Sequence, residues 1–528
     1  MVALSTKLLN HDESEATGNI SYTGTGFQPK AQLALGAIGT GFKKDVREII
    51  GIASGASDRA CIYGFSDDGV GTSDCLRRHD NAHVYMDSNV AGDGQNREAD
   101  LVSFDSDGFT YDWDTAPGTA KRFSTFNIGG SDLTNAKVFQ FQGGGTGGSV
   151  AYTGVGFQPD AIIFIGISNA TAAPDTNNSR VTTIGFTDGT NQYSIGANSE
   201  YNKGTSVSDR DESSSNVILA VKNTANHRVA AFVTFGADGF TLNWTTGSSD
   251  AYFWALCLKG GRYKVGVETQ KTSTSGSKAT TGVGFNPSGL LAISIGRVAA
   301  GIGGHGKICI GAASGASSQS GLATVDEDGQ GTTDADRYWD ESNLLTFINQ
   351  SQQINAQGDL TTFDSDGFTI NWDDGDDDDQ DSTAREFGYL AMGDAYVNVI
   401  PTLDAIADVT IDEDATEQTV NLSGITAGSG ESQPLRVTAT SSSTGLIPNP
   451  SVTYTTANAT GSIAFTPVSD ASGTATITVT VEDGGLDGDL DTGGDNGTFS
   501  RTFDVTVVPA ASSGLSGLSG LSGLSGIT

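Results

Sequence analysis

Residue types that usually mark a site or a targeting segment are scarce in this sequence. It contains four Cys, none in a Cys-x-x-Cys pair, so we predict neither a zinc nor a redox site and expect buried free thiols. With only three Met and no long stretch rich in Leu, Ala, Glu and Lys, we expect almost no long helix. No apolar run approaches the roughly 18 residues of a transmembrane helix, and the first residues lack the apolar core of a secretory signal. We therefore expect no membrane span and no such signal.

Basic residues are also few. Lys and Arg total 28 against 63 Asp and Glu, which gives a net charge of −35 without a basic stripe. Such a surface repels phosphate backbones, so nucleic acid is not an expected partner. Hydrophobic residues make up only 36% of the chain whereas Gly reaches 71, and this mixture is typical of β-rich modules with many tight turns.

Signatures of catalysis are absent from the sequence. It has no Gly-x-Ser-x-Gly elbow, no His-Glu-x-x-His and no phosphate-binding loop. Carboxylates are plentiful, but a glycosidase needs one of them in an apolar pocket, and the Asp residues here cluster in Gly-rich turns, where they stay ionised. His79 and His83 have the spacing of a zinc-binding pair, yet an exposed loop is the preferred interpretation. The sequence therefore predicts a protein that is not an enzyme.

What the chain does contain is a stretch that occurs three times. It has the form Phe-x-x-Asp-Gly-Phe-Thr-x-x-Trp and lies at residues 104–113, 235–244 and 363–372, with Ala or Gly in some of the variable positions. The recurring residues are Asp107, Gly108, Phe109, Trp113, Asp238, Gly239, Phe240, Trp244, Asp366, Gly367, Phe368 and Trp372. A second signature, Thr-Gly-x-Gly-Phe-x-Pro, precedes the first in every copy at a nearly constant distance. One module is therefore repeated three times.

We interpret the repeated stretch as a β-hairpin. Its Asp-Gly sets the turn, with hydrogen bonds from the Asp side chain to the turn backbone, and its aromatic residues alternate with polar ones as in a half-buried strand. Core packing is the preferred role of the three Trp, and an exposed sugar-stacking platform is the alternative. Function is then expected in loops that differ between copies, such as residues 68–77 and 328–337.

The spacing of the predicted strands indicates the architecture of this part. Many short strands with Gly turns predict three tandem jelly-roll-like β-sandwich modules, at residues 1–130, 131–260 and 261–395. Each ends in an aromatic-rich strand before Gly, and we expect this last strand to pair with the first one. At the other end of the chain, residues 511–528 contain Gly-Leu-Ser triplets and are expected to form a flexible tail, with a short trimeric tip as the alternative.

Around residue 396 the composition changes. Residues 396–510 are rich in Thr, Val and Ser and contain seven predicted strands, one with clear alternation. Residues 407–415, 463–475 and 479–485 resemble the bacterial Ig-type, cadherin-like repeats of large surface proteins. The resemblance implies an Ig-like β-sandwich that spaces or presents other modules, and it implies calcium binding, because many such domains bind calcium between neighbours.

Acidic residues in this part are candidate calcium ligands. Oxygen atoms at alternating positions suit a hard cation, although no EF-hand pattern is present. The candidate ligands are Asp412, Glu413, Asp414, Asp483, Asp487 and Asp489. A solvated charged loop is the alternative, and the acidic run at 373–381 is open to the same two interpretations. No other cofactor is predicted.

The repeat signatures, closed by a strand of the Tyr-Leu-Ala-Met-Gly type, resemble modules of tailed-phage virion proteins. The resemblance covers residues 1–395 and implies a non-enzymatic virion surface protein, a head decoration or a fibre. Such a protein stabilises the particle or presents its Ig-like domain for weak attachment to a host or to glycans. Its implied partners are capsid or tail proteins and host glycans, and we expect a homo-oligomer. The alternatives are a secreted bacterial adhesin or carbohydrate-binding protein and, third, a glycan-degrading enzyme. Three tandem modules also suggest an imitated trimer around a pseudo-threefold axis.

Overall fold

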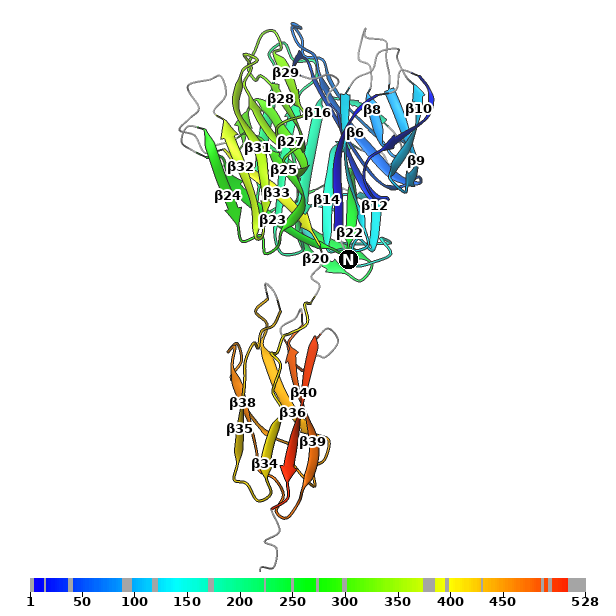
Figure 1. Cartoon of the computed structure of the whole chain (residues 1–528). Coiled ribbons are helices and arrows are strands. Elements are labelled where there is room, and N and C mark those ends of the chain that lie inside the picture. The colour runs from blue at the N-terminus through cyan, green and yellow to red at the C-terminus, as the bar shows by residue number, and fades with distance from the viewer. Residues whose placement is uncertain are drawn as a thin grey trace, which may run out of the picture. The chain divides into compact units, whose positions relative to one another are not determined.

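The protein is all-β, as predicted. The structure, a computed structural model, contains strands, turns and loops and no helix in the residues that it describes. These residues are 4–13, 16–36, 41–87, 97–115, 122–169, 175–222, 225–247, 251–271, 275–296, 302–373, 385–394, 398–428, 431–485, 489–491 and 496–510. No described segment is a helix long and apolar enough to cross a membrane. The chain forms two compact units, residues 1–395 and 396–528 (Figure 1).

The larger unit contains three sets of strands, one from each repeat. The first set is β1 (Leu4–Asp12), β2 (Gly18–Thr23), β3 (Pro29–Gly36), β4 (Gly41–Lys44), β5 (Val46–Gly55), β6 (Asp58–Ser66), β7 (Cys75–Asp80), β8 (Tyr85–Asp87), β9 (Arg97–Asp105), β10 (Gly108–Thr115) and β11 (Arg122–Gly130). The second set is β12 (Asn135–Gln142), β13 (Gly148–Thr153), β14 (Ala161–Asn169), β15 (Asp175–Asn178), β16 (Arg180–Thr187), β17 (Gln192–Ser199), β18 (Ser208–Ser213), β19 (Ile218–Lys222), β20 (Ala225–Gly236), β21 (Gly239–Thr246) and β22 (Tyr252–Lys259). The third set is β23 (Arg262–Thr269), β24 (Gly276–Thr281), β25 (Pro287–Ser294), β26 (Gly303–Gly304), β27 (Gly306–Gly315), β28 (Ser318–Asp326), β29 (Ala335–Asp340), β30 (Leu345–Ile348), β31 (Ile354–Asp364), β32 (Gly367–Asp373) and β33 (Glu386–Gly393).

Each repeat forms a large sheet and a small sheet with the same strand order. In the first repeat the small sheet runs β2-β10-β9-β8, and its own strands in the large sheet run β1-β11-β3-β5-β6-β7. The other two repeats follow this order strand for strand. The first and last strands of each repeat pair antiparallel, β1 with β11, β12 with β22 and β23 with β33, as predicted. The expectation that each module is a jelly-roll type of β-sandwich stays a prediction.

A cyclic exchange of strands completes the large sheets. The seventh strand of the first repeat's sheet is β15, which comes from the second repeat and pairs with β7. In the same way β26 of the third repeat pairs with β18 of the second, and β4 of the first repeat pairs with β29 of the third. Each repeat thus gives one strand and receives one, so the three repeats close into a ring.

The inner strands of the large sheets are buried on both faces. In β14, Ile162 and Phe164 pack in the core between the two sheets of their own repeat, whereas Ile163 and Ile165 point to the opposite face. That opposite face belongs to one hydrophobic core that takes residues from all three repeats, such as Leu33 of the first and Ile293 of the third. Because successive side chains of a strand point to opposite faces, burial of both faces accounts for the unbroken apolar run from Ala161 to Ile165 in β14. The three repeats therefore share a central core.

The smaller unit is a second β-structure with strands at the seven predicted places. They are β34 (Val409–Asp412), β35 (Gln418–Leu422), β36 (Leu435–Ser441), β37 (Ser451–Thr453), β38 (Gly461–Phe465), β39 (Gly473–Asp483) and β40 (Thr498–Val508). They form a sheet of order β34-β40-β39-β36 and a sheet of order β35-β38-β37. One face of β39, with Ala475, Ile477, Val479 and Val481, is fully buried in the core of this unit, and the other face is partly exposed.

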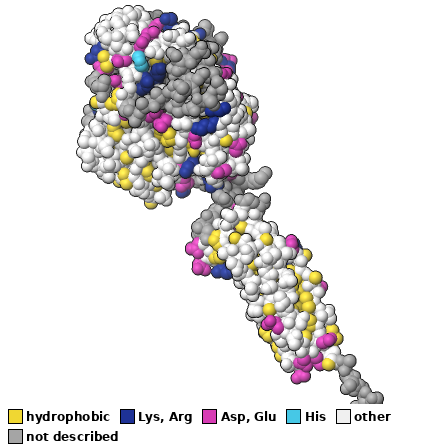
Figure 2. Space-filling view, turned by 90° about the vertical axis from the view of Figure 1, so that its left-hand side faces the viewer, with side chains coloured by type: hydrophobic (Ala, Val, Ile, Leu, Met, Phe, Trp, Pro, Cys, Tyr) yellow, Lys and Arg dark blue, Asp and Glu magenta, His cyan; other side chains and the backbone are white. Residues whose placement is uncertain are grey.

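Charged side chains of both signs lie on the surface. On the face shown in Figure 2, acidic and basic side chains are interspersed among uncharged ones in both units. The exposed large hydrophobic residues, such as Ile20, Val102 and Val233, lie on different strands. The described surface therefore points to no single apolar docking face.

Candidate functional site at the junction of the repeats

The two repeated signatures bind each other. The Asp107 carboxylate accepts a hydrogen bond from the Gly26 amide at 2.6 Å, and the Gly24 amide donates to the Asp107 carbonyl at 3.0 Å. In the third repeat, the carboxylate of Asp366 accepts from Gly282 and Gly284. Hydrogen bonds from these two amides lower the pKa of Asp366. The prediction placed these Asp bonds within the hairpin turn, but the carboxylate reaches the glycine signature because that loop lies beside the turn.

Asp238 of the second repeat makes the same pair of bonds, to the amides of Gly154 and Gly156 at 3.0 and 2.5 Å. The glycine after each of these Asp residues is required by close approach. Gly108 has a φ of 152°, and a Cβ there would collide with the carbonyl oxygen of Tyr22. The repeated Asp-Gly is therefore a structural contact between two strands' ends.

The repeated aromatic residues belong to the core, as predicted. Trp113, Trp244 and Trp372 are at most 2% exposed, and the Nε1 atoms of Trp113 and Trp244 donate to the hydroxyls of Tyr22 and Tyr152 at 3.0 and 2.9 Å. Each lies between the two sheets of its repeat, together with the Phe of the same stretch. A buried indole presents no face to a sugar, so these residues do not form the alternative stacking platform.

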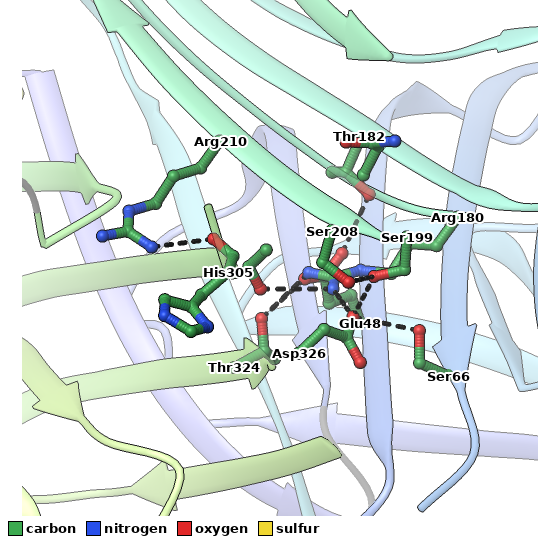
Figure 3. A network of polar contacts seen from close by, with 12 residues as sticks. Glu48, Ser66, Arg180, Thr182, Ser199, Ser208, Arg210, His305, Thr324 and Asp326 are labelled. Carbon is green, nitrogen blue, oxygen red and sulfur yellow. Dashed lines mark hydrogen bonds and ion pairs between the residues drawn. The ribbon is translucent and has the colours of Figure 1, made fainter. Parts of the chain in front are cut away.

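A buried ion network joins the three repeats (Figure 3). Arg180 on β16 of the second repeat makes ion pairs with Glu48 on β5 of the first and Asp326 on β28 of the third. The hydroxyls of Thr182 and Thr324 donate to the two oxygens of Glu48, each at 2.8 Å. All three charged side chains are almost completely excluded from solvent. Burial raises the pKa of Asp326, and the charge of Arg180 opposes that effect. The buried carboxylates of Glu48 and Asp326 are therefore stabilised as anions only while the cation of Arg180 lies beside them.

Equivalent positions of the repeats meet at this network. The pairs Ile50–Ile62, Ile184–Ile195 and Ile310–Leu322 have the same register in the three large sheets. Four residues beyond the second member of each pair stand Ser66, Ser199 and Asp326. Both serine hydroxyls donate to the Asp326 carboxylate, Ser66 at 3.0 Å (Figure 3). Three equivalent positions that contact one another mark the pseudo-threefold axis.

The loops that follow these positions also link the repeats in a ring. The Asn202 amide donates to the Ser73 carbonyl at 2.7 Å, and the Gly329 amide donates to the Ser206 carbonyl at 2.9 Å. The Gly69 amide completes the ring by donating to the Thr333 carbonyl at 2.8 Å. Residues 68–77 and 328–337 were expected to carry function because the copies differ there, and this stays a prediction. Their described contacts tie one repeat to the next, because these turns converge where the three repeats meet.

The arrangement is suited to holding modules together rather than to chemistry on a ligand. A reacting group must be reached by its substrate, whereas Arg180 and Glu48 are at most 1% exposed. Their ion pairs and the surrounding threonine bonds satisfy charges that would otherwise be costly to bury. The position of Arg180 is occupied by Val46 in the first repeat and by Gly306 in the third, so the network also distinguishes the three repeats.

The two histidines with zinc-like spacing are separated in the structure. His79 is fully buried and lies against Trp254, with ring centroids 4.8 Å apart. His83 contacts Asp80 at 3.1 Å and Asp114 at 3.2 Å, and it forms with Asp100 and Asp114 a group of potential metal ligands. Burial lowers the pKa of His83, but the hydrogen bond to Asp80 and the neighbouring carboxylates outweigh that effect and raise it to about 9. A protonated imidazole pairs with carboxylates, so a metal ion at this group would have to displace the proton of His83. The four Cys are free and buried, as expected.

The six candidate calcium ligands do not form one site. Asp412 ends β34 and Glu413 and Asp414 follow it, and the register of β34 with β40 places Asp412 beside Val508. Asp483 ends β39 near the start of β40, where its neighbour Glu482 pairs with Thr498. Ten residues of β40 at ~3.3 Å each separate the two groups by roughly 33 Å. Asp489 lies in a short described segment after β39, and Asp487 lies outside the described residues.

The group around Asp483 has the character of a cation site. Asp483 is fully buried, and its Oδ1 atom accepts hydrogen bonds from Asn398, Gly485 and Gly497 at 2.7 to 2.9 Å. Its Oδ2 atom has no partner among the described residues, and the same holds for the side-chain oxygens of Gln433 and Asn496 nearby in the hydrogen-bond network. Buried oxygens with unused lone pairs suit calcium, so these residues fit the implied ion.

Comparisons with known proteins leave the family open. No family model matches the chain, and no curated protein matches it in sequence. Among solved structures, a GH32 beta-fructofuranosidase of Bombyx mori aligns at 10% identity over 70% of this chain and 95% of that chain, with a TM-score of 0.12. A TM-score this low carries no argument about fold or function.

Proposed function

We propose that this protein is a non-enzymatic surface protein of a tailed-phage particle, in which one chain supplies a threefold-like base and carries one Ig-like unit. The observation that supports the proposal is the cyclic exchange of β4, β15 and β26, which closes three repeats into one body. Closed assemblies include threefold-symmetric ones, and a chain with three fused modules can occupy a threefold position while carrying a single copy of an appended domain.

The buried junction agrees with a structural role. Its ion network, its glycine contacts and its shared core all join modules, and they leave the charged groups of the network beyond the reach of a substrate. The homo-oligomer expected from the sequence then corresponds to many copies of this chain arrayed on one particle. The Ig-like unit would be displayed for weak attachment to host surface glycans.

Mass spectrometry of purified particles tests the proposal. We expect peptides from both units at a copy number set by the symmetry of the particle, and density with three similar lobes where the larger unit binds. Capsid or tail genes beside the coding gene would agree with this result. Absence of the protein from purified particles would exclude it as a virion component and favour the secreted adhesin. Hydrolysis of a glycan by the purified chain would contradict a non-enzymatic role.

A further inference from the structure

The third repeat contains a cavity beside the junction, and Thr324 belongs to both. Its volume is about 320 Å³, at the lower end of the range of small-molecule sites. Strands β27, β28 and β30 of the third repeat form part of its wall, and Arg210 on β18 of the second repeat contributes from across the boundary between repeats. The wall combines apolar side chains such as Phe347 with the amide side chains of Asn349 and Asn355.

Positive charge gathers in this cavity although the chain is strongly acidic. Arg210, Lys307 and Arg385 all line it, and no Asp or Glu is among the described residues of its wall. The chain as a whole carries 63 acidic residues against 28 basic ones, so three cations without a carboxylate in one wall is a marked departure. A concave surface of one sign in a low-dielectric wall concentrates ions of the opposite sign.

Each of the three cations donates a hydrogen bond to a neutral oxygen. The Lys307 ammonium donates to the Ile348 carbonyl at 3.2 Å, and Arg210 donates to the His305 carbonyl at 2.8 Å. Arg385 donates to the Gln270 side-chain oxygen at 2.9 Å, and its guanidinium lies 5.6 Å from the centre of the Phe347 ring. Burial, followed by the charges of Arg210 and Arg385, lowers the pKa of Lys307 to about 7. An anion in the cavity would relieve this repulsion.

The first repeat shows what the same place looks like when it is neutralised internally. Its Arg47 stands at the position of Lys307, three residues before the paired isoleucine of its strand. Arg47 makes ion pairs with Asp45 at 3.0 Å and with Asp87 at 3.5 Å. The third repeat has His305 and Phe347 at the positions of those two aspartates.

Other differences between the repeats around the position of Lys307 also remove charge pairing from the third repeat. Arg97, which pairs with Asp87 at 3.0 Å inside the first repeat, has Ala356 as its counterpart in the third. The second repeat has Val181 at the position of Lys307 and so lacks the cation. Within a threefold-repeated scaffold, only the third copy therefore combines a basic residue here with the loss of both neighbouring aspartates.

We propose that this cavity binds a small sugar-sized anion, whose acidic group lies among Lys307, Arg210 and Arg385. Guanidinium and ammonium groups bind carboxylates and phosphates through charge-assisted hydrogen bonds, and the amides of Asn349 and Asn355 supply donors and acceptors for hydroxyls. The volume admits one monosaccharide unit. A sugar acid and a sugar phosphate share the required chemistry. The inference stands apart from the virion proposal, because it depends only on the residues that line this cavity in the second and third repeats.

Calorimetric titration of the full chain tests the site. The probes are sodium glucuronate, glucose 6-phosphate and, as the neutral control, glucose. We expect at least one acidic probe to bind, glucose not to bind, and Lys307→Met to weaken the acidic probe at least tenfold. Lys264→Met, which removes a lysine outside the cavity, should leave binding unchanged. Comparing the two acidic probes decides between carboxylate and phosphate.

Two results would overturn the proposal. One is failure of both acidic probes to bind, and the other is unchanged binding by Lys307→Met. Thermal melts of each variant show whether it is folded, and Lys307→Met is expected to fold because it removes a charge that has no ion pair with a described residue. Lys307→Arg keeps the charge and should retain binding.

The pH dependence of binding separates an electrostatic site from simple loss of shape. The groups that face Lys307 are Arg210, Arg385, His305 and, farther off, Glu327. Because the anion requires protonated Lys307, affinity should fall by up to tenfold for each pH unit above about 7, with proton uptake on binding. Lys307→Arg should bind with little change from pH 7 to 9. Equal pH profiles for the wild type and Lys307→Arg would contradict the role of Lys307.

Discussion

The two units of this chain bury their strands in different ways. Strand β16 of the larger unit is buried at every residue, because one face lies in the central core and the other packs against β19 of the small sheet, whereas β39 of the smaller unit is fully buried on one face only. Their ion pairs differ in the same sense. Arg180 is completely buried at the junction, whereas Arg436 pairs with Glu482 with 42% of its side chain exposed. We therefore expect the three repeats to need one another for folding and the smaller unit to fold by itself.

The strongest test of this difference is to separate the parts. A fragment of residues 131–260 would expose the central face of its large sheet and would lack the donated strand β26. We expect it not to fold as a monomer, since the lost burial removes most of the stabilising free energy. Residues 396–510 alone should unfold cooperatively, as followed by circular dichroism and light scattering. A monomeric 131–260 fragment with a cooperative transition would show that the repeats are independent.

The next largest effect is expected at the ion network. Arg180→Ala leaves Glu48 and Asp326 buried without their cation, and we expect a loss of ~3–5 kcal/mol in the free energy of unfolding. Urea denaturation of the full chain measures this loss in the transition of the larger unit. Arg436→Ala is the control, and it should leave the stability of the smaller unit unchanged because that pair is exposed to solvent.

A triple variant shows whether the cost comes from unpaired charge. Arg180→Met combined with Glu48→Leu and Asp326→Leu removes all three charges together, and its stability should lie much closer to that of the wild type. If the triple variant is as unstable as Arg180→Ala, the attraction between the three charges itself stabilises the junction. The interpretation that the cost of Arg180→Ala comes from unpaired buried carboxylates would then be wrong.

The sequence predicts the elements better than it predicts their assembly. Period-two alternation locates β39, and the repeated Asp-Gly-Phe locates the hairpins, because both signals are local. The shared core has a signal too, since the run from Ala161 to Ile165 has no polar residue and so indicates burial on both faces. Strand exchange has no such signal in the sequence, because the residues of β4 do not indicate that it pairs with a strand of another repeat.

The junction and the cavity show a second limit of prediction from the sequence. Glu48 lies within β5, Arg180 begins β16 and Asp326 ends β28, and a charge at a buried position of a strand is a sign of a buried partner. The partners are more than a hundred residues apart and come from non-equivalent positions, so comparing the copies does not pair them. Lys307 was missed for a related reason: its departure from Arg47 is a change in what surrounds it, which only the folded sheets reveal.

The effect of Lys307 on the free energy of unfolding can be compared with that of the ion network. Its pKa is lowered from 10.5 to about 7 in the folded chain, so between these values the unfolded chain binds more protons. Stability therefore rises with pH through this window. Relative to Lys307→Met, the wild type should gain about 1–2 kcal/mol from pH 7 to pH 9. Urea denaturation of both proteins at several pH values measures the difference, and parallel curves would show that the ammonium is not desolvated.

The smallest effect is expected from calcium on the smaller unit. The buried Oδ2 atom of Asp483 has no partner among the described residues, so a bound cation would remove the cost of a buried carboxylate oxygen. We expect calcium to raise the melting temperature of the 396–510 fragment by several degrees, which corresponds to about 1 kcal/mol in a domain of this size. Scanning calorimetry with calcium and with a chelator measures the shift.

A pair of matched variants shows which end of the smaller unit is responsible. Asp483→Asn keeps the hydrogen-bond acceptor but removes the charge, and it should abolish the calcium-induced shift. Asp414→Asn changes a carboxylate near the opposite end of β40, where Asp414 accepts a hydrogen bond from the Asp470 amide, and it should preserve the shift. Loss of the shift in Asp414→Asn alone would move the site to the other group of predicted ligands. An unchanged melt of the wild-type fragment with calcium and with chelator would mean that the buried oxygen of Asp483 is satisfied without a metal.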